Sequence, residues 1–305
     1  MRTHFISLLV VLTAAAAGCG GGRDDRRPLG DGGASADAVV VPDGAPDSTM
    51  PDTDAGPDAG AVEGLHVAFD YRFDTRGFFA DPVRRALLDA AAAEWATRLS
   101  DDFPDIPAGT DVRSRDPEQP DMPGLNFPIE DPIDDVLVFV GCAPTSGGTA
   151  RSNHAAALAT IRDATLQAAL RERYEGPDFQ PWTGWISFSC DEDWFFDPTP
   201  GTDDDIRAGA VDFLSTALHE IAHVLGFGTA GAFGALVGGA AFTGAGAVTL
   251  YGAPIPVTSD GVHIDATVRW EGSAPLMAPS RWVGTRRHPG TLEDAMLGDI
   301  GYAAR

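Results

Sequence analysis

Residues 218–228 read Leu218-His219-Glu220-Ile221-Ala222-His223-Val224-Leu225-Gly226-Phe227-Gly228. Apolar periodicity predicts that most of this stretch belongs to a helix over about residues 210–227. Two histidines four residues apart lie one above the other on a helix, so both imidazoles can reach one metal ion. Gly226 comes one turn later and predicts the end of the helix, where the chain must turn away from such an ion.

Glu220 stands beside the first of the two histidines, where it can face a water molecule instead of the metal. Zinc lowers the pKa of such a water towards 7, and a nearby carboxylate can take the proton as the oxygen attacks a polarised carbonyl. The pattern therefore predicts that His219 and His223 bind zinc and that Glu220 is the general base of a peptide-bond hydrolase. The alternative is that both histidines are ordinary polar groups of a surface or core helix.

A catalytic zinc takes three protein ligands and keeps one position open. In the longer form of the motif, found in metzincin peptidases, a third histidine follows three residues after the glycine. That position is Thr229 here. Because threonine is a poor zinc ligand, the third ligand must come from elsewhere in the chain.

Several segments downstream of the helix carry a family pattern. They are Phe242-Thr243-Gly244-Ala245-Gly246-Ala247, Tyr251-Gly252, Pro254-Ile255-Pro256-Val257, Gly261-Val262-His263, Pro275-Leu276-Met277-Ala278-Pro279 and the closing stretch 292–302, which ends Asp299-Ile300-Gly301-Tyr302. In these segments the chain resembles the leishmanolysin family of metzincin zinc endopeptidases. The resemblance covers about residues 180–305, with a shorter insertion and fewer cysteines than leishmanolysin itself has.

In that family an inserted segment displaces the third histidine, which precedes a Leu-Met segment that forms the Met-turn under the metal. By position, the resemblance implies that His263 is the third zinc ligand and that Met277 is the structural Met-turn methionine. Asp260, Asp265 and, more distantly, His288 are the alternative ligands. The fold that it implies is α/β (α+β), with a twisted mixed sheet, an active-site helix and a C-terminal subdomain that contains the Met-turn.

Residues 185–194 are similar to the metzincin edge strand that precedes the active-site helix. We therefore expect an extended substrate to pair its backbone with residues 185–189 and to lie across the zinc. Sequence preference would come from the wall after the Met-turn, for which Pro279, Ser280 and Arg281 are the candidates.

Three acidic residues follow this predicted strand, namely Asp191, Glu192 and Asp193. Carboxylate oxygens are the ligands that calcium prefers, so these residues are candidates for a structural Ca²⁺ site. The alternative is a plain solvated turn.

Hydrophobic periodicity predicts alternating strands and helices in the rest of the folded part. Strands are expected at residues 65–73, 136–140 and 182–189, and helices at residues 81–99, 155–173 and 210–227. Residues 101–132 are rich in Pro and Asp and are expected to be loop. The interleaving of strands and helices indicates a layered α/β or α+β arrangement.

Cys142 and Cys190 each lie at the end of an apolar, strand-like run. In an exported domain two such thiols predict a disulfide. A zinc site built on them is disfavoured, because no third or fourth thiol is available in the folded part.

Residues 1–19 read as an export signal, in which Arg2 gives the charge, residues 5–12 are mostly apolar and small residues precede Cys19. This stretch resembles a bacterial lipoprotein signal peptide, with Ala16 where Leu is usual. The resemblance implies that Cys19 is acylated and anchors the mature protein, in the outer membrane or at the surface. An ordinary secretory signal that is cut nearby is the alternative.

Residues 20–63 consist largely of Gly, Ala, Asp and Pro and have almost nothing to bury. Such a composition predicts a disordered spacer. The catalytic domain is therefore expected to span residues 64–305.

The whole chain is acidic, with 45 acidic and 21 basic side chains among 305 residues and a formal net charge of −24. All the basic residues are arginine, and none are clustered, so we expect no nucleic-acid partner and no membrane contact beyond the lipid anchor. At 44% apolar residues the chain has ample material for a core. The oligomeric state is left open.

The sequence thus predicts an exported, secreted or surface-anchored zinc metalloendopeptidase that acts on proteins or peptides. Two other classes stay open. One is a catalytically silent surface binding module on the same scaffold, against which the presence of Glu220 argues. The other is an exported hydrolase of non-peptide substrates, because the same zinc chemistry suits other acyl groups.

Overall fold

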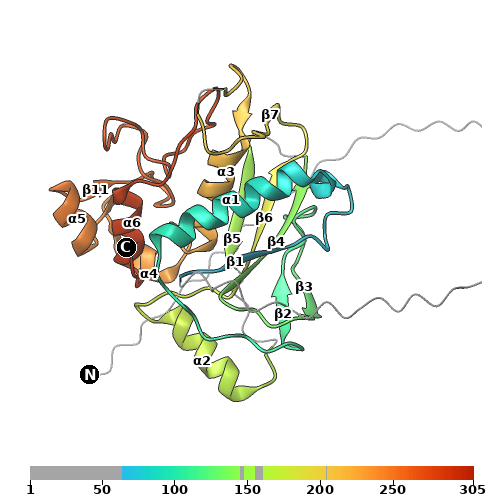
Figure 1. Cartoon of the computed structure of the whole chain (residues 1–305). Helices are drawn as coiled ribbons and strands as arrows, with labels where there is room; N and C mark the ends of the chain where they lie inside the picture. The colour runs from blue at the N-terminus through green and yellow to red at the C-terminus, as the bar shows by residue number, and fades with distance from the viewer. Residues whose placement is uncertain (1–63, 145–147, 155–160, 204) are drawn as a thin grey trace, which may run out of the picture. The chain divides into compact units, whose positions relative to one another are not determined.

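A four-stranded mixed sheet organises the part of the chain that the structure describes. This computed structural model describes residues 64–144, 148–154, 161–203 and 205–305. The strands, in spatial order, are β1 (Val67–Asp70), β4 (Val136–Ala143), β6 (Thr183–Ser189) and β5 (Ala150–His154) (Figure 1). The first three are parallel, and β5 is antiparallel to β6. The described chain is therefore a mixed α/β fold of the α+β class.

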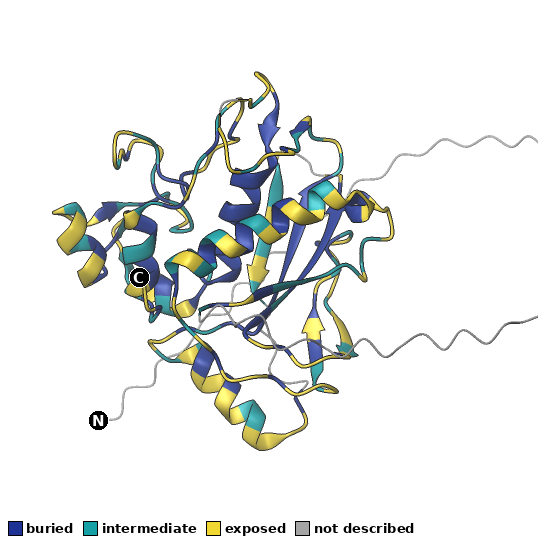
Figure 2. Ribbon diagram, viewed as in Figure 1, coloured by how far each residue is buried: buried dark blue, intermediate teal, exposed yellow. Residues whose placement is uncertain are grey.

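Alternate side chains of the central strands enter two different cores. In β4, Val140 packs into the main core and Phe139 into a second core. In β6, Ile186 and Trp185 divide in the same way. Successive side chains of a strand point to opposite faces, so both faces of the sheet are covered. Figure 2 accordingly shows the central strands in the colour of buried residues.

Two helices, α1 (Pro82–Arg98) and α3 (Phe213–Val224), pack against each other on the main-core face of the sheet (Figure 1). Trp95 of α1 is fully buried and donates its indole N–H to the Leu218 carbonyl of α3 at 3.0 Å. Every residue of α3 is buried. This helix is thus held by its neighbour helix as well as by the sheet.

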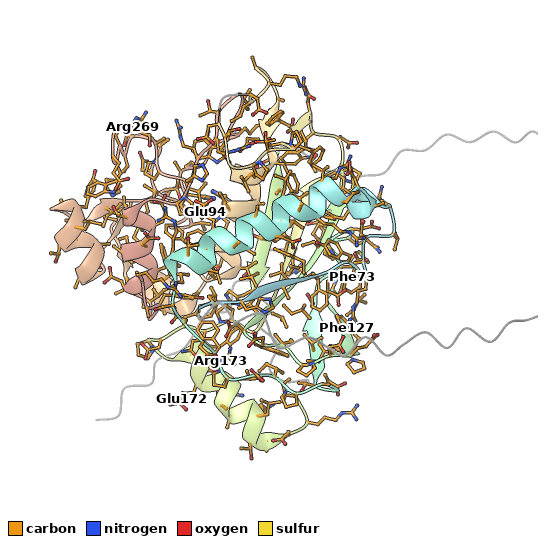
Figure 3. The ribbon with its side chains drawn as sticks, viewed as in Figure 1. Phe73, Glu94, Phe127, Glu172, Arg173 and Arg269 are labelled. Atoms are coloured by element: carbon orange, nitrogen blue, oxygen red, sulfur yellow. A yellow bond between two sulfur atoms is a disulfide. The ribbon has the colours of Figure 1, made fainter. Side chains whose placement is uncertain are left out.

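The opposite face is covered by α2 (Ala164–Glu175) and by a hairpin of β2 (Asp111–Ser114) and β3 (Leu125–Pro128). Phe73 and Phe127, both labelled in Figure 3, meet edge to face at 5.6 Å between ring centroids. The hairpin lies within residues 101–132, which were expected to be loop. That expectation missed two strands of four residues each.

Each of the three longest helices begins after a capping aspartate, and α3 begins at Phe213, later than the expected residue 210, because residues 211 and 212 form β8 and Asp212 caps the helix. Asp81 accepts the N–H of Val83 at the start of α1, and α3 ends before Gly226, which has a φ of 102°. The expected helix at residues 155–173 instead begins at Ala164, because Asp163 caps it by accepting two backbone N–H groups. Residues 155–160 of that prediction lie outside the described residues.

The prediction that residues 185–189 form an edge strand is wrong. β6 pairs with β4 on one side and with β5 on the other, and all seven of its residues are buried. The outer strand on that side is β5, with the sequence Ala-Arg-Ser-Asn-His. This short polar segment has no apolar alternation by which a strand is recognised. The edge was predicted at residues 185–189 from the resemblance alone.

Residues after α3 build a smaller subdomain. It contains α4 (Gly231–Ala235), a three-stranded sheet of β9 (Val237–Gly238), β10 (Ala241–Phe242) and β11 (Ile255–Pro256), α5 (Ala245–Tyr251) and α6 (Thr291–Gly298). Asp299 joins the last two helices, because its carboxylate accepts the N–H groups of Gly246 and Ala247 at 2.7 and 2.8 Å. Figure 1 shows α5, α6 and β11 together at one side of the molecule.

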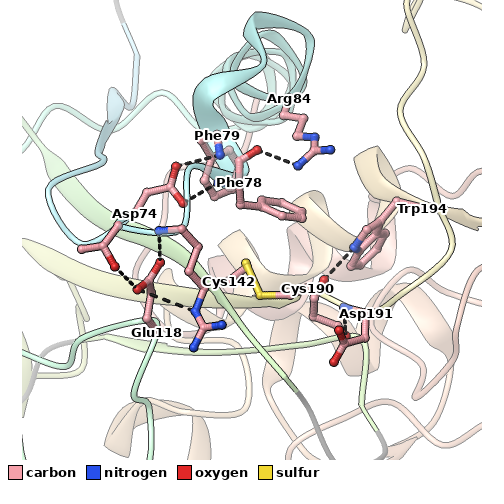
Figure 4. The surroundings of a disulfide bond; sticks show 12 residues. Asp74, Phe78, Phe79, Arg84, Glu118, Cys142, Cys190, Asp191 and Trp194 are labelled. Atoms are coloured by element: carbon pink, nitrogen blue, oxygen red, sulfur yellow. Dashed lines mark hydrogen bonds and ion pairs between the residues drawn. A yellow bond between two sulfur atoms is a disulfide. The ribbon is translucent and has the colours of Figure 1, made fainter. Parts of the chain in front are cut away.

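Cys142 and Cys190 form the predicted disulfide, with 5.2 Å between their Cα atoms. The bond joins the C-terminal part of β4 to the residue after β6. Figure 4 shows that Phe78 and Phe79 of the 3-10 helix η1 (Phe78–Ala80) lie near the disulfide. The carboxylate of Asp74 fixes this turn by accepting both of their backbone N–H groups.

Cys19, the expected signal peptide and the expected spacer all lie outside the described residues. Within the described ranges, none of the helices combines the length and the hydrophobicity that crossing a bilayer requires.

A remaining parallel pair of strands, β7 (Trp194–Phe195) and β8 (Val211–Asp212), precedes α3, which begins directly after β8.

Replacing both Cys142 and Cys190 by serine should lower the free energy of unfolding by up to about 4 kcal/mol, because the disulfide closes a loop of 48 residues. Urea unfolding of the variant and of the wild type, with and without reductant, measures this. The reduced wild type should unfold at the same urea concentration as the variant. Equal midpoints for the oxidised wild type and the variant would contradict the stabilising role.

Candidate metal centre

Three imidazoles converge at the C-terminal end of α3. The Nε2 atom of His223 lies 3.1 Å from Nε2 of His219 and 3.2 Å from Nε2 of His263. The ligand nitrogens of all three residues lie within 4.8 Å of one another. Nitrogens bound to one tetrahedral zinc ion are about 3.3 Å apart. The structure therefore brings together the three residues expected as ligands, and two of the three nitrogen pairs lie near the spacing that one ion would need.

Backbone carbonyls fix the proton positions of two of these rings. Nδ1 of His219 lies 2.9 Å from the Leu276 carbonyl, and Nδ1 of His223 lies 2.8 Å from the Phe227 carbonyl. A carbonyl can only accept, so each Nδ1 carries the hydrogen and each neutral ring has its lone pair on Nε2. The Nε2 lone pairs of the two rings thus point towards the same place, which is the arrangement that two ligands of one cation would have.

Burial keeps the three rings in the neutral form that binds metals. It lowers the pKa of His219 to about 4, with a contribution from nearby His263. Burial also lowers the pKa of His223 and that of His263. At neutral pH each of these rings therefore has an unprotonated nitrogen, which is the state that a metal ligand must have.

The segment that carries His263 reaches α3 because Gly228 has no side chain. Gly228 has a φ of 70°, and a Cβ atom there would collide with the Val262 carbonyl. The segment is held on its other side by Thr258, whose backbone N–H donates to the His263 carbonyl at 2.9 Å and whose hydroxyl accepts the His263 N–H at 3.1 Å. The absence of a side chain at residue 228 therefore allows the close approach of the segment that carries His263.

The two aspartates considered as alternative ligands are engaged elsewhere. The Asp260 carboxylate accepts the Thr258 hydroxyl and the Val262 N–H, and the Asp265 carboxylate accepts from Thr267. Neither joins the histidine group. His263 is thus the third residue that the structure supplies.

Met277 is fully buried in a turn beside this group. The turn is closed by a hydrogen bond from the Ala278 N–H to the Pro275 carbonyl, and the Met277 carbonyl accepts the Ile264 N–H at 2.9 Å. The carbonyl that accepts from His219 belongs to Leu276, in the same turn. The turn therefore supports both His219 of α3 and the segment that carries His263.

A cavity of about 370 Å³ opens beside the imidazoles. It is lined by residues 148–150 at the start of β5, by Thr216, His219, Glu220 and His263, and by the segment from Pro279 to Trp282. Pro279, Ser280 and Arg281 are the wall residues that the sequence suggested. The Arg281 guanidinium pairs with the Glu192 carboxylate at this wall.

Glu220 points its carboxylate towards β5, where Oε2 accepts the hydroxyl of Ser152 at 2.6 Å. Burial raises the pKa of the Glu220 carboxyl to about 7, although the hydrogen bond from Ser152 opposes the rise. A carboxyl with such a pKa can both take and return a proton near neutral pH. Ser152 was not identified from the sequence, because nothing in the segment 150–154 distinguishes it.

A buried arginine fixes the N-terminal end of α3. Arg286 donates to both oxygens of Asp212, at 3.1 and 2.9 Å, and forms an ion pair with Asp197 at 2.7 Å. Asp212 also caps the helix by accepting the N–H and the hydroxyl of Ser215. Removal of one partner from such a buried network is strongly destabilising, so the network holds α3, the helix that carries His219 and His223, in place. Sequence reasoning missed it, although an aspartate just before a helix is a capping signal.

The acidic residues proposed for calcium do not converge. Glu192 pairs with Arg281, and Asp193 pairs with Arg207. A second acidic group, formed by Asp102, Asp134 and Asp135, does occur among the described residues. Two of its members are exposed, and its buried member already accepts two backbone N–H groups.

His288, the most distant alternative ligand, lies away from the other imidazoles and beside α1. Its Nδ1 atom is 2.9 Å from the carboxylate of Glu94, a residue that Figure 3 labels on α1. The hydrogen bond to Glu94 raises the pKa of His288, and the charge of Glu94 adds to the rise. His288 therefore stabilises the packing of the C-terminal subdomain against α1.

Comparison of the chain with protein-family models, with curated proteins and with solved structures finds no match.

Substituting Gly228→Ala should lower the affinity for zinc by about tenfold or more, because the added Cβ pushes Val262 and His263 away from His223. Competition with a chromophoric chelator measures the affinity. Gly231→Ala is the matched control, since a Cβ there meets no atom within 4 Å. Wild-type affinity in Gly228→Ala would show that residue 228 does not set the position of the third histidine.

His288 should titrate in NMR with a pKa above its ordinary value of about 6.5, and Glu94→Gln should return it towards that value. A raised pKa in the folded state means that the pair stabilises the fold fully below about pH 6.5 and that this contribution is lost as the pH rises through the folded pKa. Wild type should therefore exceed Glu94→Gln in unfolding free energy by more at pH 5.5 than at pH 9. An equal difference at both values would contradict the assignment.

Proposed function

We propose that this protein is a zinc metalloendopeptidase of the leishmanolysin-like metzincin type. The observation that carries the proposal is the convergence of three imidazole Nε2 atoms beside a buried glutamate at the mouth of a cavity. Three imidazoles with one open side form the donor set of many catalytic zinc sites. The order of the motif residues along the chain, and the Met277 turn beside them, support the same type.

A zinc ion held by His219, His223 and His263 would polarise the scissile carbonyl and make a water molecule a nucleophile at neutral pH. Glu220 then takes the proton of the attacking water and delivers it to the leaving nitrogen. Ser152 holds one carboxylate oxygen of Glu220, so the other oxygen is left for this proton transfer. The low polarity around Glu220 strengthens its attraction for the proton.

The outer strand β5 is the proposed support for the substrate backbone. Among the described strands, β5 pairs only with β6, and its N-terminal end lines the cavity beside the metal centre. An extended peptide can add to such an edge by main-chain hydrogen bonds. This geometry favours a peptide over a small acyl compound, and it moves the expected pairing from residues 185–189 to β5.

The region from Pro279 to Trp282 is the proposed wall for the side chain that follows the scissile bond, because it lines the same cavity as His219, Glu220 and His263. The disulfide between Cys142 and Cys190 supports the proposal that the protein is exported, since such bonds persist in oxidising compartments. Acylation of Cys19 remains part of this proposal as an expectation from the sequence.

Purified full-length protein should degrade casein or gelatin, and a chelator of divalent metals should abolish the cleavage. Glu220→Ala should reduce the rate by about 10²- to 10⁴-fold without loss of bound zinc, because it removes the general base and leaves the ligands intact. His263→Ala should lose both zinc and activity. Metal analysis of each variant gives the controls.

Two outcomes separate the rival functions. A folded, zinc-loaded protein that cleaves no member of a peptide library would favour a silent binding module. Hydrolysis of esters or small amides, with no cleavage of proteins, would favour a hydrolase of non-peptide substrates.

A further inference from the structure

Glu293 is a buried carboxylate for which the proposed reaction has no use. It lies on α6 with 1% of its surface exposed. Its Oε1 accepts the N–H of Met277 at 3.1 Å, and its Oε2 accepts the N–H of Gly290 at 3.0 Å. Burial raises the pKa of Glu293 to about 6, so the group is mostly ionised at neutral pH. A buried charge is costly unless strong hydrogen bonds compensate for it.

One of these two bonds leads to the metal centre. The N–H of Met277 and the carbonyl of Leu276 belong to one planar peptide group. That carbonyl accepts the Nδ1–H of His219 at 2.9 Å. The carboxylate and the imidazole therefore lie at opposite ends of a single peptide unit. Hydrogen bonds in such a chain polarise one another, and an ionised acceptor at one end strengthens the next bond.

We propose that Glu293 is a positioning residue of the metal centre, which acts through the Leu276–Met277 peptide group to orient the His219 ring and to make its Nε2 a stronger zinc donor. Metal-binding histidines commonly donate their other N–H to a carboxylate or a carbonyl, and loss of that partner lowers metal affinity by about 10- to 100-fold. Here the carboxylate acts at the distance of one peptide group. The inference rests on the proposed function only in naming zinc as the cation.

His223 offers an internal comparison. Its Nδ1 also donates to a carbonyl, that of Phe227, at 2.8 Å. The far end of that peptide group is the N–H of Gly228, and no carboxylate among the described residues accepts from it. The two helix ligands therefore differ in one respect, namely whether an ionised group stands behind the carbonyl.

A purely structural role for Glu293 is the rival explanation, because the same carboxylate also joins α6 to the Met277 turn. Asp299 provides the matched control for that role. It accepts two backbone N–H groups, of Gly246 and Ala247, and joins α6 to α5 with no link to a metal ligand. Loss of its charge should loosen the same subdomain without changing the donor strength of His219.

The experiment measures zinc dissociation constants of the full-length protein by chelator competition at pH 7.5, together with thermal unfolding. Glu293→Gln should weaken zinc binding by about tenfold, whereas Asp299→Asn should leave it within about twofold. Equal zinc affinity in Glu293→Gln and wild type would overturn the inference, as would equal losses in the two variants. A wild type that binds no zinc would overturn both this inference and the proposed function.

A second measurement needs no variant and therefore survives if Glu293→Gln fails to fold. In protein labelled with ¹⁵N-histidine, the Nδ1 proton of His219 should resonate further downfield than that of His223, because its carbonyl acceptor is polarised by a carboxylate. The same or the reverse order of the two shifts would overturn the inference. Neither measurement depends on peptide cleavage, so a protein that binds zinc and cleaves nothing still tests the role of Glu293.

Discussion

The facing lone pairs of His219 and His223 are the constraint on which the rest of this structure depends. Each ring donates its Nδ1–H to a backbone carbonyl, so each Nε2 atom has a lone pair. The two Nε2 atoms are buried and lie 3.1 Å apart. Burial disfavours a proton between them, and under the proposed function a shared cation would relieve the repulsion of the two lone pairs. The capping of α3 by Asp212, the indole of Trp95 and the turn at Met277 all serve to hold this helix and its ligands where a third imidazole can meet them.

The sequence predicted the local part of this centre and could not predict the remote part from spacing alone. Four-residue spacing on a helix is a matter of geometry, so His219 and His223 were fixed as neighbours once the helix was recognised. His263 comes from a distant loop, and only the resemblance to leishmanolysin indicated it. The structure brings it to 3.2 Å from His223 because Gly228 leaves room for its segment. Glu293 carried no signal of a link to the metal centre, since the group that connects it there is the backbone N–H of Met277, which any residue except proline provides.

Prediction of the sheet succeeded for buried strands and failed at the edge. The runs that became β4 and β6 are apolar because both faces of those strands are covered. β5 has one strand neighbour and a polar sequence, so periodicity does not predict it, and the resemblance placed the edge at β6 instead. β5 is stabilised by its backbone hydrogen bonds to β6 and by the hydrogen bond from Ser152 to Glu220. Both are long-range interactions, so the local sequence does not reveal this strand.

X-ray absorption at the zinc edge of the purified full-length protein tests the central claim most directly. The account predicts one zinc per chain with three imidazole nitrogens at about 2.0–2.1 Å, one further light-atom ligand and no sulfur. Protein without stoichiometric zinc, or zinc bound by fewer than three imidazoles, would contradict it.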